Sequence, residues 1–276
     1  MIDILLSTYQ SEKYLEILIE SLLNQEYTDW NLLIRDDGST DNTIKILNVY
    51  QKNYPTKIYV LPNTKENVGV IKSFEHLLKY SNAEYLMFCD HDDIWLPKKI
   101  EISIQKMIET EKANPNLPIL VHTDLTVVNS DTEVINPSFW KFSKLNPTLL
   151  SRFNYLGVCN GITGCTVILN SKAKEICLPF SKHALMHDSW VALCISKYGK
   201  IAYVDKSTIL YRQHELNKIG AKEIKSVFEY FRARLRNLKQ VINENNKQFE
   251  LLKELQYGTK FKYYYFKILY FIKARL

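Results

Sequence analysis

The chain has 276 residues, of which 46% are hydrophobic and 24% are charged, and its formal net charge is +6. This balance is that of an ordinary globular protein, and the length fits one large α/β domain with an appendage or two small domains. No stretch approaches ~20 uncharged apolar residues, and no basic region precedes the apolar run that starts at Ile2. We therefore expect neither a membrane-spanning helix nor a signal peptide.

The cysteines and the distribution of charge add two expectations. The five cysteines are odd in number and include no CxxC pair, which predicts reduced, mostly buried thiols in a cytoplasmic protein. Residues 218–276 carry 14 Lys/Arg and 5 Glu, a net +9, whereas the rest of the chain carries 22 basic and 25 acidic residues, a net −3. A basic tail suits an anionic surface, either a membrane or a nucleic acid.

The first ninety residues alternate between short apolar runs and segments with apolar residues at helical spacing. The predicted strands are 2–6, 31–35, 57–61 and 85–89. This alternation predicts a parallel sheet covered by helices on both faces, in which ligands bind outside the carboxyl ends of the strands. Polar clusters follow three of these strands, at Thr8-Tyr9, at Asp36-Asp37-Gly38 and at Asp90 to Asp93.

The last of these clusters places three carboxylates in four residues: Asp90, Asp92 and Asp93. In an extended backbone Asp90 and Asp92 point the same way and Asp93 points to the other face. Like-charged carboxylates repel each other unless a cation, a proton or water compensates, and hard divalent ions suit such ligands. The cluster therefore indicates a metal-diphosphate site, with a solvated turn that caps the next helix, near Pro97, as the alternative.

Phosphate-binding loops of the common kinds are absent from the sequence. No G-x-G-x-x-G follows the first strand, and no G-x-x-x-x-G-K-[ST] occurs. Phosphates would therefore be held through a metal ion and basic side chains.

The second half of the chain is less regular. We expect a helix at about 97–112, strands at 119–128, 166–169 and 201–204, and a further segment from Leu210 to His214. Residues 129–155 are loop-rich and resemble an insertion over a site. The glycines between Gly157 and Thr166 allow either close backbone approach to a ligand or a tight bend. A helix begins near His187-Asp188.

From about residue 223 the pattern becomes helical. One stripe is predicted to pack on the body or on a partner, where it could form a dimer seam; it consists of Val227, Phe231, Leu235, Leu238 and Ile242. The last segment, 261–276, mixes tyrosines and phenylalanines with lysines and an arginine and holds no acid. That mixture suits a membrane interface, and a helix pair with a solvated basic face is the alternative.

Taken together, these segments resemble a family 2 glycosyltransferase of the GT-A fold. The matching motifs occur in family order over about residues 1–217: Ser7 to Leu15, Arg35 to Asp41, Asn67 to Val70, Asp90 to Trp95, His187-Asp188, and Tyr211 to His214. Several of them resemble the bacterial branch that includes rhamnosyltransferases of surface-polysaccharide assembly. His91 stands where that branch usually has Gln, and Ser189 where it often has an aromatic residue, and both differences bear on sugar preference.

The resemblance implies an α/β fold with a mostly parallel sheet and two regions: a GT-A catalytic domain at 1–217 and a basic helical extension at 218–276. It implies an inverting transfer that needs Mn²⁺ or Mg²⁺. The donor would be dTDP-rhamnose or a UDP-hexose, and the acceptor a polysaccharide or lipid-linked saccharide. The expected location is cytoplasmic, peripheral at the inner face of the membrane, with no nucleic-acid partner and with a homodimer as one option.

Two other function classes stay open at this point. A sugar-phosphate nucleotidyltransferase also uses acidic metal ligands, although Ser7 to Lys13 has one lysine and no glycine where that class usually needs a Gly-rich basic loop. The other alternative is a non-catalytic binding protein on the same fold.

The resemblance also implies roles for single residues on the metal side. Asp92 would bind the metal most directly, and Asp90 would contact the ribose or the metal shell. Arg212 and His214, two residues apart, would contact the diphosphate or complete the metal shell.

On the nucleotide side, Thr8 and Tyr9 would line the base pocket. Asp37 would accept a hydrogen bond from a pyrimidine N3–H, because a carboxylate only accepts, and Asp36 could form the turn with Gly38. Asp188 is the candidate general base, since inversion requires the base on the face opposite the leaving group. Its alternative role is that of a helix N-cap.

Overall fold

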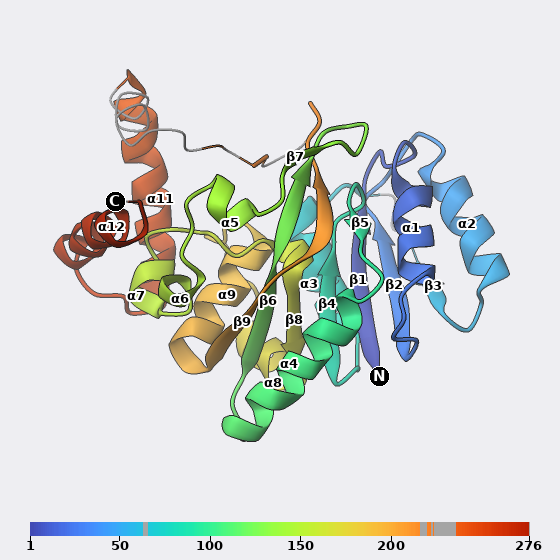
Figure 1. Cartoon of the computed structure of the whole chain (residues 1–276), viewed down its shortest axis with the longest axis horizontal. Helices are drawn as coiled ribbons and strands as arrows, with labels where there is room; N and C mark the ends of the chain where they lie inside the picture. The colour runs from blue at the N-terminus through green and yellow to red at the C-terminus, as the bar shows by residue number, and fades with distance from the viewer. Residues whose placement is uncertain (63–65, 216–219, 222, 224–235, 276) are drawn as a thin grey trace.

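The computed structural model describes residues 1–62, 66–215, 220–221, 223 and 236–275 (Figure 1). One mixed sheet runs through the middle of the described molecule. Its strands follow the order β3-β2-β1-β4-β8-β6-β9-β5, and β7 pairs with β6 outside this path. Helices cover both faces, and the two C-terminal helices lie at the end of the molecule opposite to α1 and α2 (Figure 1).

The first half of the sheet is parallel, as the alternation of strands and helices predicts. It consists of β1 (Ile2–Thr8), β2 (Trp30–Asp36), β3 (Ile58–Val60) and β4 (Tyr85–Cys89). The register pairs Thr8 with Asp36 and Leu6 with Cys89. The carboxyl ends of these strands therefore meet at one rim, which brings their polar clusters together.

Alternating side chains of the strands build a core on each face of the sheet. In β1, Ile4 packs with the helices of one face, and Leu5 packs with Phe74 on the other. The first face is covered by α1 (Leu15–Leu23), α2 (Thr43–Asn53) and α4 (Lys99–Ala113). The second is covered by α3 (Val70–Tyr80), α8 (Ser171–Cys177) and α9 (His187–Tyr198). Each fully buried aliphatic side chain contributes about 1.5–3 kcal/mol, so this double core holds the rim rigidly.

The second half of the sheet mixes directions. It contains β5 (Ile94–Trp95), β6 (Ile119–Val128), β7 (Val134–Asn136), β8 (Val167–Asn170) and β9 (Lys200–Arg212). β8 runs antiparallel to both β4 and β6, whereas β9 is parallel to β6 and antiparallel to β5. The two segments expected at 201–204 and from 210 onward are one strand, because register shifts against β6 at Asp124 accommodate the polar residues between them.

The region expected to be loop-rich, 129–155, also holds β7 and three one-turn helices. They are α5 (Phe139–Phe142), α6 (Pro147–Leu150) and α7 (Phe153–Leu156). The side chains of Ser138 and Asn146 cap the first two by accepting backbone N–H groups at each N-terminus. A short 3-10 turn, η1 (Gly164–Thr166), precedes β8.

The C-terminal helices α11 (Leu238–Glu254) and α12 (Lys260–Arg275) complete the described chain. Leu252, Tyr257 and Tyr263 join the same core cluster as α9. Val227, Phe231 and Leu235 of the predicted stripe lie outside the described residues, as does the expected boundary between residues 217 and 218. The other two members, Leu238 and Ile242, are 52% and 46% exposed, so a dimer seam stays a prediction.

All five thiols are free and four of them are buried, which confirms the prediction of unpaired, mostly buried cysteines; the cytoplasmic location stays a prediction. Among the described residues, none of the helices combines the length and apolar character that crossing a bilayer requires.

Candidate active site

The rim above β1 and β2 is organised around the Asp36 carboxylate. Its Oδ1 accepts hydrogen bonds from the hydroxyls of Thr8 at 2.9 Å and Ser39 at 2.6 Å. Its Oδ2 accepts the backbone N–H of Gly38 at 3.0 Å and of Ser39 at 2.8 Å. Gly38 has a φ of +84°, which suits glycine, so Asp36 forms the structural turn expected of it. The neighbouring Tyr9 is 49% exposed at this rim.

Asp37 fastens the end of β2 to the start of α3. Its Oδ1 accepts from Arg35 Nη1 at 2.6 Å and from the Val68 N–H at 2.9 Å, and its Oδ2 accepts from the Gly69 N–H at 2.8 Å. The Arg35–Asp37 ion pair is almost fully buried. Three of about four acceptor positions on this carboxylate are thus in use, and one remains for a ligand. The role of Asp37 toward a pyrimidine stays a prediction.

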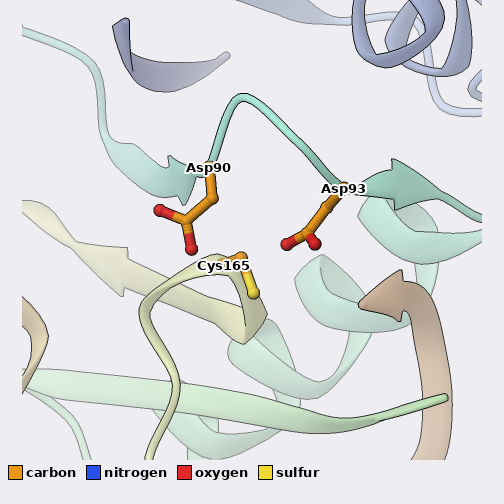
Figure 2. A group of neighbouring side chains, drawn as sticks. All are labelled: Asp90, Asp93 and Cys165. Carbon is orange, nitrogen blue, oxygen red and sulfur yellow. The ribbon is translucent and has the colours of Figure 1, made fainter. Parts of the chain in front are cut away.

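After β4 the chain turns sharply through Asp90 to Asp93 and does not continue as an extended strand. Figure 2 shows the carboxylates of Asp90 and Asp93 on the same side of this turn, with the Cys165 sulfur near both. One ligand atom from each of these three residues lies within 4.8 Å of the others. The prediction that Asp93 faces away is therefore wrong, because side chains alternate only in an extended backbone. Asp93 does not cap α4 either, since the N-cap of that helix is Lys98.

Asp92 meets the end of β9. Its Oδ2 lies 2.9 Å from His214 Nε2, and each side chain is only about a tenth exposed. The imidazole ring of His214 lies against Tyr14, with 5.0 Å between ring centroids. Two of the residues predicted as metal ligands thus lie side by side.

Arg212 holds the acidic turn in place. Its Nε donates to the Asp92 carbonyl at 3.0 Å, and its backbone N–H donates to Asp93 Oδ1 at 3.2 Å. Its Nη1 donates to the Ser130 carbonyl at 2.6 Å, and the guanidinium lies 4.6 Å from the centre of the Tyr14 ring. The side chain is buried, so these contacts assign Arg212 a positioning role, and contact with a diphosphate stays a prediction.

Asp188 lies in the first turn of α9. Its Oδ2 accepts the backbone N–H of Gly164 at 3.0 Å, and its Oδ1 accepts that of Ser189 at 2.6 Å. The N-cap of the helix is Met186, so the alternative interpretation of Asp188 as the cap is wrong in position. A Cβ on Gly164 would lie 2.9 Å from His187 Nε2 and 3.3 Å from the Asp188 Cβ. Glycine at this position therefore allows close packing against α9.

Two consecutive residues connect Asp188 to the acidic turn. Gly164 donates to Asp188, and Cys165 lies against Asp90 and Asp93 (Figure 2). Burial, together with the negative charges of Asp92 and Asp188, raises the pKa of Asp90 to about 7. Burial likewise raises the pKa of Asp188 to about 6 and that of Asp93 well above its usual range. This crowding of buried acids is the electrostatic condition under which a divalent cation binds favourably.

The donor atoms decide where such an ion fits. Burial raises the pKa of the Cys165 thiol, which therefore stays protonated, and hard cations disfavour sulfur. Asp92 and His214 offer a carboxylate oxygen and an imidazole nitrogen 2.9 Å apart, with Asp90 two residues away. The oxygen and nitrogen donors of the acidic turn and His214 thus fit a manganese- or magnesium-type ion, and the choice of Asp92, Asp90 and His214 as its ligands stays a prediction.

The sequence indicated that the glycines between Gly157 and Thr166 permit close approach, but it did not predict that Gly164 and Cys165 contact the aspartates, or that Lys99 is buried near them. Lys99 is fully buried with its Nζ 4.5 Å from the centre of the Trp95 ring, and the described residues supply no hydrogen bond to it. Burial lowers its pKa to about 8, against the opposing effect of the nearby Asp93. The glycines before Cys165 were a usable signal for close approach, but nothing in the sequence indicated that Lys99 turns inward.

The chain is similar to known proteins. The profile of Glycosyl transferase family 2 matches residues 3–177. The dTDP-rhamnosyl transferase RfbG of Shigella flexneri is 30% identical over 231 residues, covering 78% of this chain and 74% of that protein. An Escherichia coli protein described as UDP-Glc:alpha-D-GlcNAc-diphosphoundecaprenol beta-1,3-glucosyltransferase, WfgD, is 27% identical over 82% of this chain and 83% of its own length.

Two solved structures are similar in fold. Staphylococcus aureus TarS 1–349 in complex with UDP-GlcNAc has a TM-score of 0.58 at 19% identity, covering 92% of this chain and 70% of that one. The mannosyltransferase PcManGT of Pyrobaculum calidifontis, solved with GDP-Man and Mn²⁺, has a TM-score of 0.60 at 14% identity, covering 80% of this chain and 58% of that one.

The sheet and its acidic rim thus define a GT-A protein, the class that the sequence motifs predicted. More particularly, the chain belongs to glycosyl transferase family 2. It is a glycosyltransferase that takes its sugar from a nucleotide sugar.

Proposed function

We propose that this enzyme transfers a sugar, with inversion of the anomeric centre, from a pyrimidine nucleoside diphosphate sugar to a hydroxyl of a lipid-linked saccharide or polysaccharide. The similarity to RfbG favours dTDP-rhamnose as the donor, with a UDP-hexose as the second candidate. The similarity to WfgD, which is described as acting on a diphosphoundecaprenol-linked sugar, favours a lipid-linked acceptor.

The observation that carries this proposal is the connection between Asp188 and the acidic turn. Asp188 and Asp90 come from segments almost a hundred residues apart, yet the charge of Asp188 is close enough to raise the pKa of Asp90. Gly164 and Cys165 bridge the two groups. A single bound sugar can therefore be flanked by a phosphate-side group and a separate carboxylate.

On the phosphate side, Asp92, His214 and Asp90 would hold Mn²⁺ or Mg²⁺. When bound there, the ion supplies positive charge to the diphosphate leaving group. Arg212 keeps the turn that carries these ligands in position through its hydrogen bonds to Asp92 and Asp93.

On the nucleotide side, Thr8 and Tyr9 would line the base pocket, and the remaining acceptor position of Asp37 would receive the N3–H of uracil or thymine. Cytosine has no such donor. This arrangement supports a preference for uridine or thymidine donors.

On the acceptor side, Asp188 would remove the proton of the attacking hydroxyl. Its pKa is raised to about 6 by burial, so the carboxylate is ionised near neutral pH and still basic enough to take a proton. The N–H groups of Gly164 and Ser189 fix its orientation.

The first test is Asp188→Asn, which keeps the shape of the side chain and removes its basicity. Transfer should fall by a factor on the order of 10² or more while donor binding stays largely intact. Transfer to an acceptor extract and binding of the nucleotide sugar would be measured in parallel. Asp131→Asn, at an exposed loop position, is the matched control. Unchanged turnover in Asp188→Asn would remove this residue from the mechanism.

We also propose a division of labour along the chain. Residues 1–217 would carry the donor site and catalysis, and residues 218–276 would dock the enzyme at the inner face of the membrane, where a lipid-linked acceptor is presented. The excess of basic residues in the second region supports this division.

A further inference from the structure

Helix α12 has one face that is packed and one that is not. On the packed face, Tyr263 and Tyr270 are buried, and Phe266 meets Tyr155 of α7 with 5.3 Å between ring centroids. Tyr270 also accepts the backbone N–H of Asn146 through its hydroxyl. The orientation of the helix on the body is therefore fixed.

The opposite face is apolar and exposed. At about 100° per residue, its large side chains fall within an arc of about 100° on the helical wheel. They are Phe261, Tyr264, Tyr265, Ile268 and Ile272, and they are 82%, 41%, 50%, 62% and 47% exposed. Soluble proteins seldom gather such side chains on one surface, and gathered ones mark an interaction site.

Lysines flank this arc on the helical wheel, and the described helix holds no acidic residue. Lys262 and Lys273 fall on one side of it. On the other side Lys260 donates to Asn246 of α11 at 3.2 Å and Lys267 donates to Asn245 of α11, so these two are already engaged within the protein.

The neighbouring α11 carries three glutamates. Glu250 pairs with Lys253 at 2.7 Å and Glu254 with His183 at 2.6 Å, and Glu244 accepts a hydrogen bond from Gln240 at 2.9 Å.

An apolar arc bordered by the cations Lys262 and Lys273 matches the chemistry of an anionic lipid surface. The apolar side chains reach the boundary between headgroups and acyl chains, while these two lysines meet the phosphates. A second copy of the chain fits less well, because pairing two such faces would bring the lysines of both copies together.

We infer that the outer face of α12 binds an anionic bilayer with the helix lying parallel to the membrane plane. This specifies the membrane contact proposed above, and its test uses no sugar transfer. α12 contacts α7, and α7 contacts α9, whose first turn carries Asp188. The bilayer is thereby held in a fixed position relative to the acceptor side of the site (Figure 1).

The test is co-sedimentation of the full chain with vesicles of phosphatidylcholine, with and without phosphatidylglycerol. The wild type should bind the anionic vesicles, and the combined change Phe261→Ser, Ile268→Ser and Ile272→Ser should weaken binding by about tenfold or more. Lys262→Gln with Lys273→Gln should weaken it by about fivefold per lysine on anionic vesicles only. The matched control is Val134→Ser with Ile135→Ser, which removes exposed apolar side chains from β7.

Circular dichroism melting of each variant checks that the fold is retained, as expected for exposed positions. The inference would be overturned if the wild-type protein did not bind anionic vesicles, or if the triple variant bound them as well as the wild type does. A dimer in gel filtration that the triple variant abolishes would also overturn it, because the face would then be occupied by a second copy. Vesicle binding without sugar transfer would instead count against the proposed chemistry alone.

Discussion

Two adjacent parts of the same rim use carboxylates in opposite ways. At the end of β2, Asp36 and Asp37 are surrounded by hydroxyls, backbone N–H groups and the Arg35 guanidinium. At the end of β4, Asp90 and Asp93 face each other and a protonated thiol, and burial raises the pKa of both. In the first pair most acceptor positions are filled by the protein itself, whereas the second pair gains most from a ligand that brings positive charge. Runs of aspartate that look alike in sequence thus differ in what they require.

The largest expected effect is at the acidic turn after β4, on Asp92, which lies between Asp90 and Asp93 in the chain. Asp92→Ala should weaken metal-dependent binding of the nucleotide by roughly 10²-fold or more, since the ion is worth several kcal/mol. Isothermal titration calorimetry with Mn²⁺ would measure this, and wild-type protein in EDTA should behave in the same way. The melting temperature should not fall, because the change removes one of several crowded negative charges. Tight binding of the nucleotide in EDTA would contradict the proposal that the acidic turn binds it through a metal ion.

Substitution of Asp37, whose carboxylate is paired within the protein, should lower the stability of the fold. Asp37→Ala leaves the buried Arg35 without its partner, which should lower the free energy of unfolding by about 3–5 kcal/mol. Urea unfolding would measure it, with Asp29→Ala, an exposed carboxylate, as the control. A loss below about 1 kcal/mol would mean that the Arg35–Asp37 pair does not support the rim.

An intermediate effect is expected at Gly164, which lies between Asp188 and the acidic turn. In Gly164→Ala the new methyl group would press on His187 and Asp188, so the proposed base would shift. We expect transfer to fall by about tenfold with little change in nucleotide binding. Steady-state kinetics with donor and acceptor varied separately would distinguish these. A variant that loses nucleotide binding but retains transfer at saturating donor would contradict the proposal that Gly164 positions Asp188.

The smallest effect is a pH dependence. Because burial raises the pKa of Asp188 to about 6, the group is ionised above that pH and protonated below it. The transfer rate should therefore be flat above pH 7 and fall with decreasing pH, reaching half near pH 6 at saturating Mn²⁺. The profile of the Asp188→Asn variant should lack this step. A rate that rises toward lower pH would contradict the role of Asp188 as a base.

The sequence was sufficient for the first half of the fold and for the residue types at the rim. The short apolar runs before Thr8, Asp36 and Asp90 alternate with helical segments, which predicts parallel strands, and parallel strands bring their ends together. The sequence did not predict the orientation of Asp93, because side chains alternate between faces only while the backbone is extended, and the backbone turns after Cys89. Gly164 and Lys99 depend on contacts between distant segments, which no local spacing encodes. In the second half, antiparallel β8 and the capped one-turn helices arise from tertiary packing and local caps that override a loop-like composition.

The end of β9 has a consequence for how the site comes into being. Arg212 and His214 fasten a turn that lies about 120 residues earlier in the chain. A nascent chain that has emerged only as far as β8 therefore has its acids but lacks the imidazole and the guanidinium that secure them. Since synthesis proceeds from the N-terminus, the proposed phosphate site would be completed only after the last strand of the sheet, β9, has been translated.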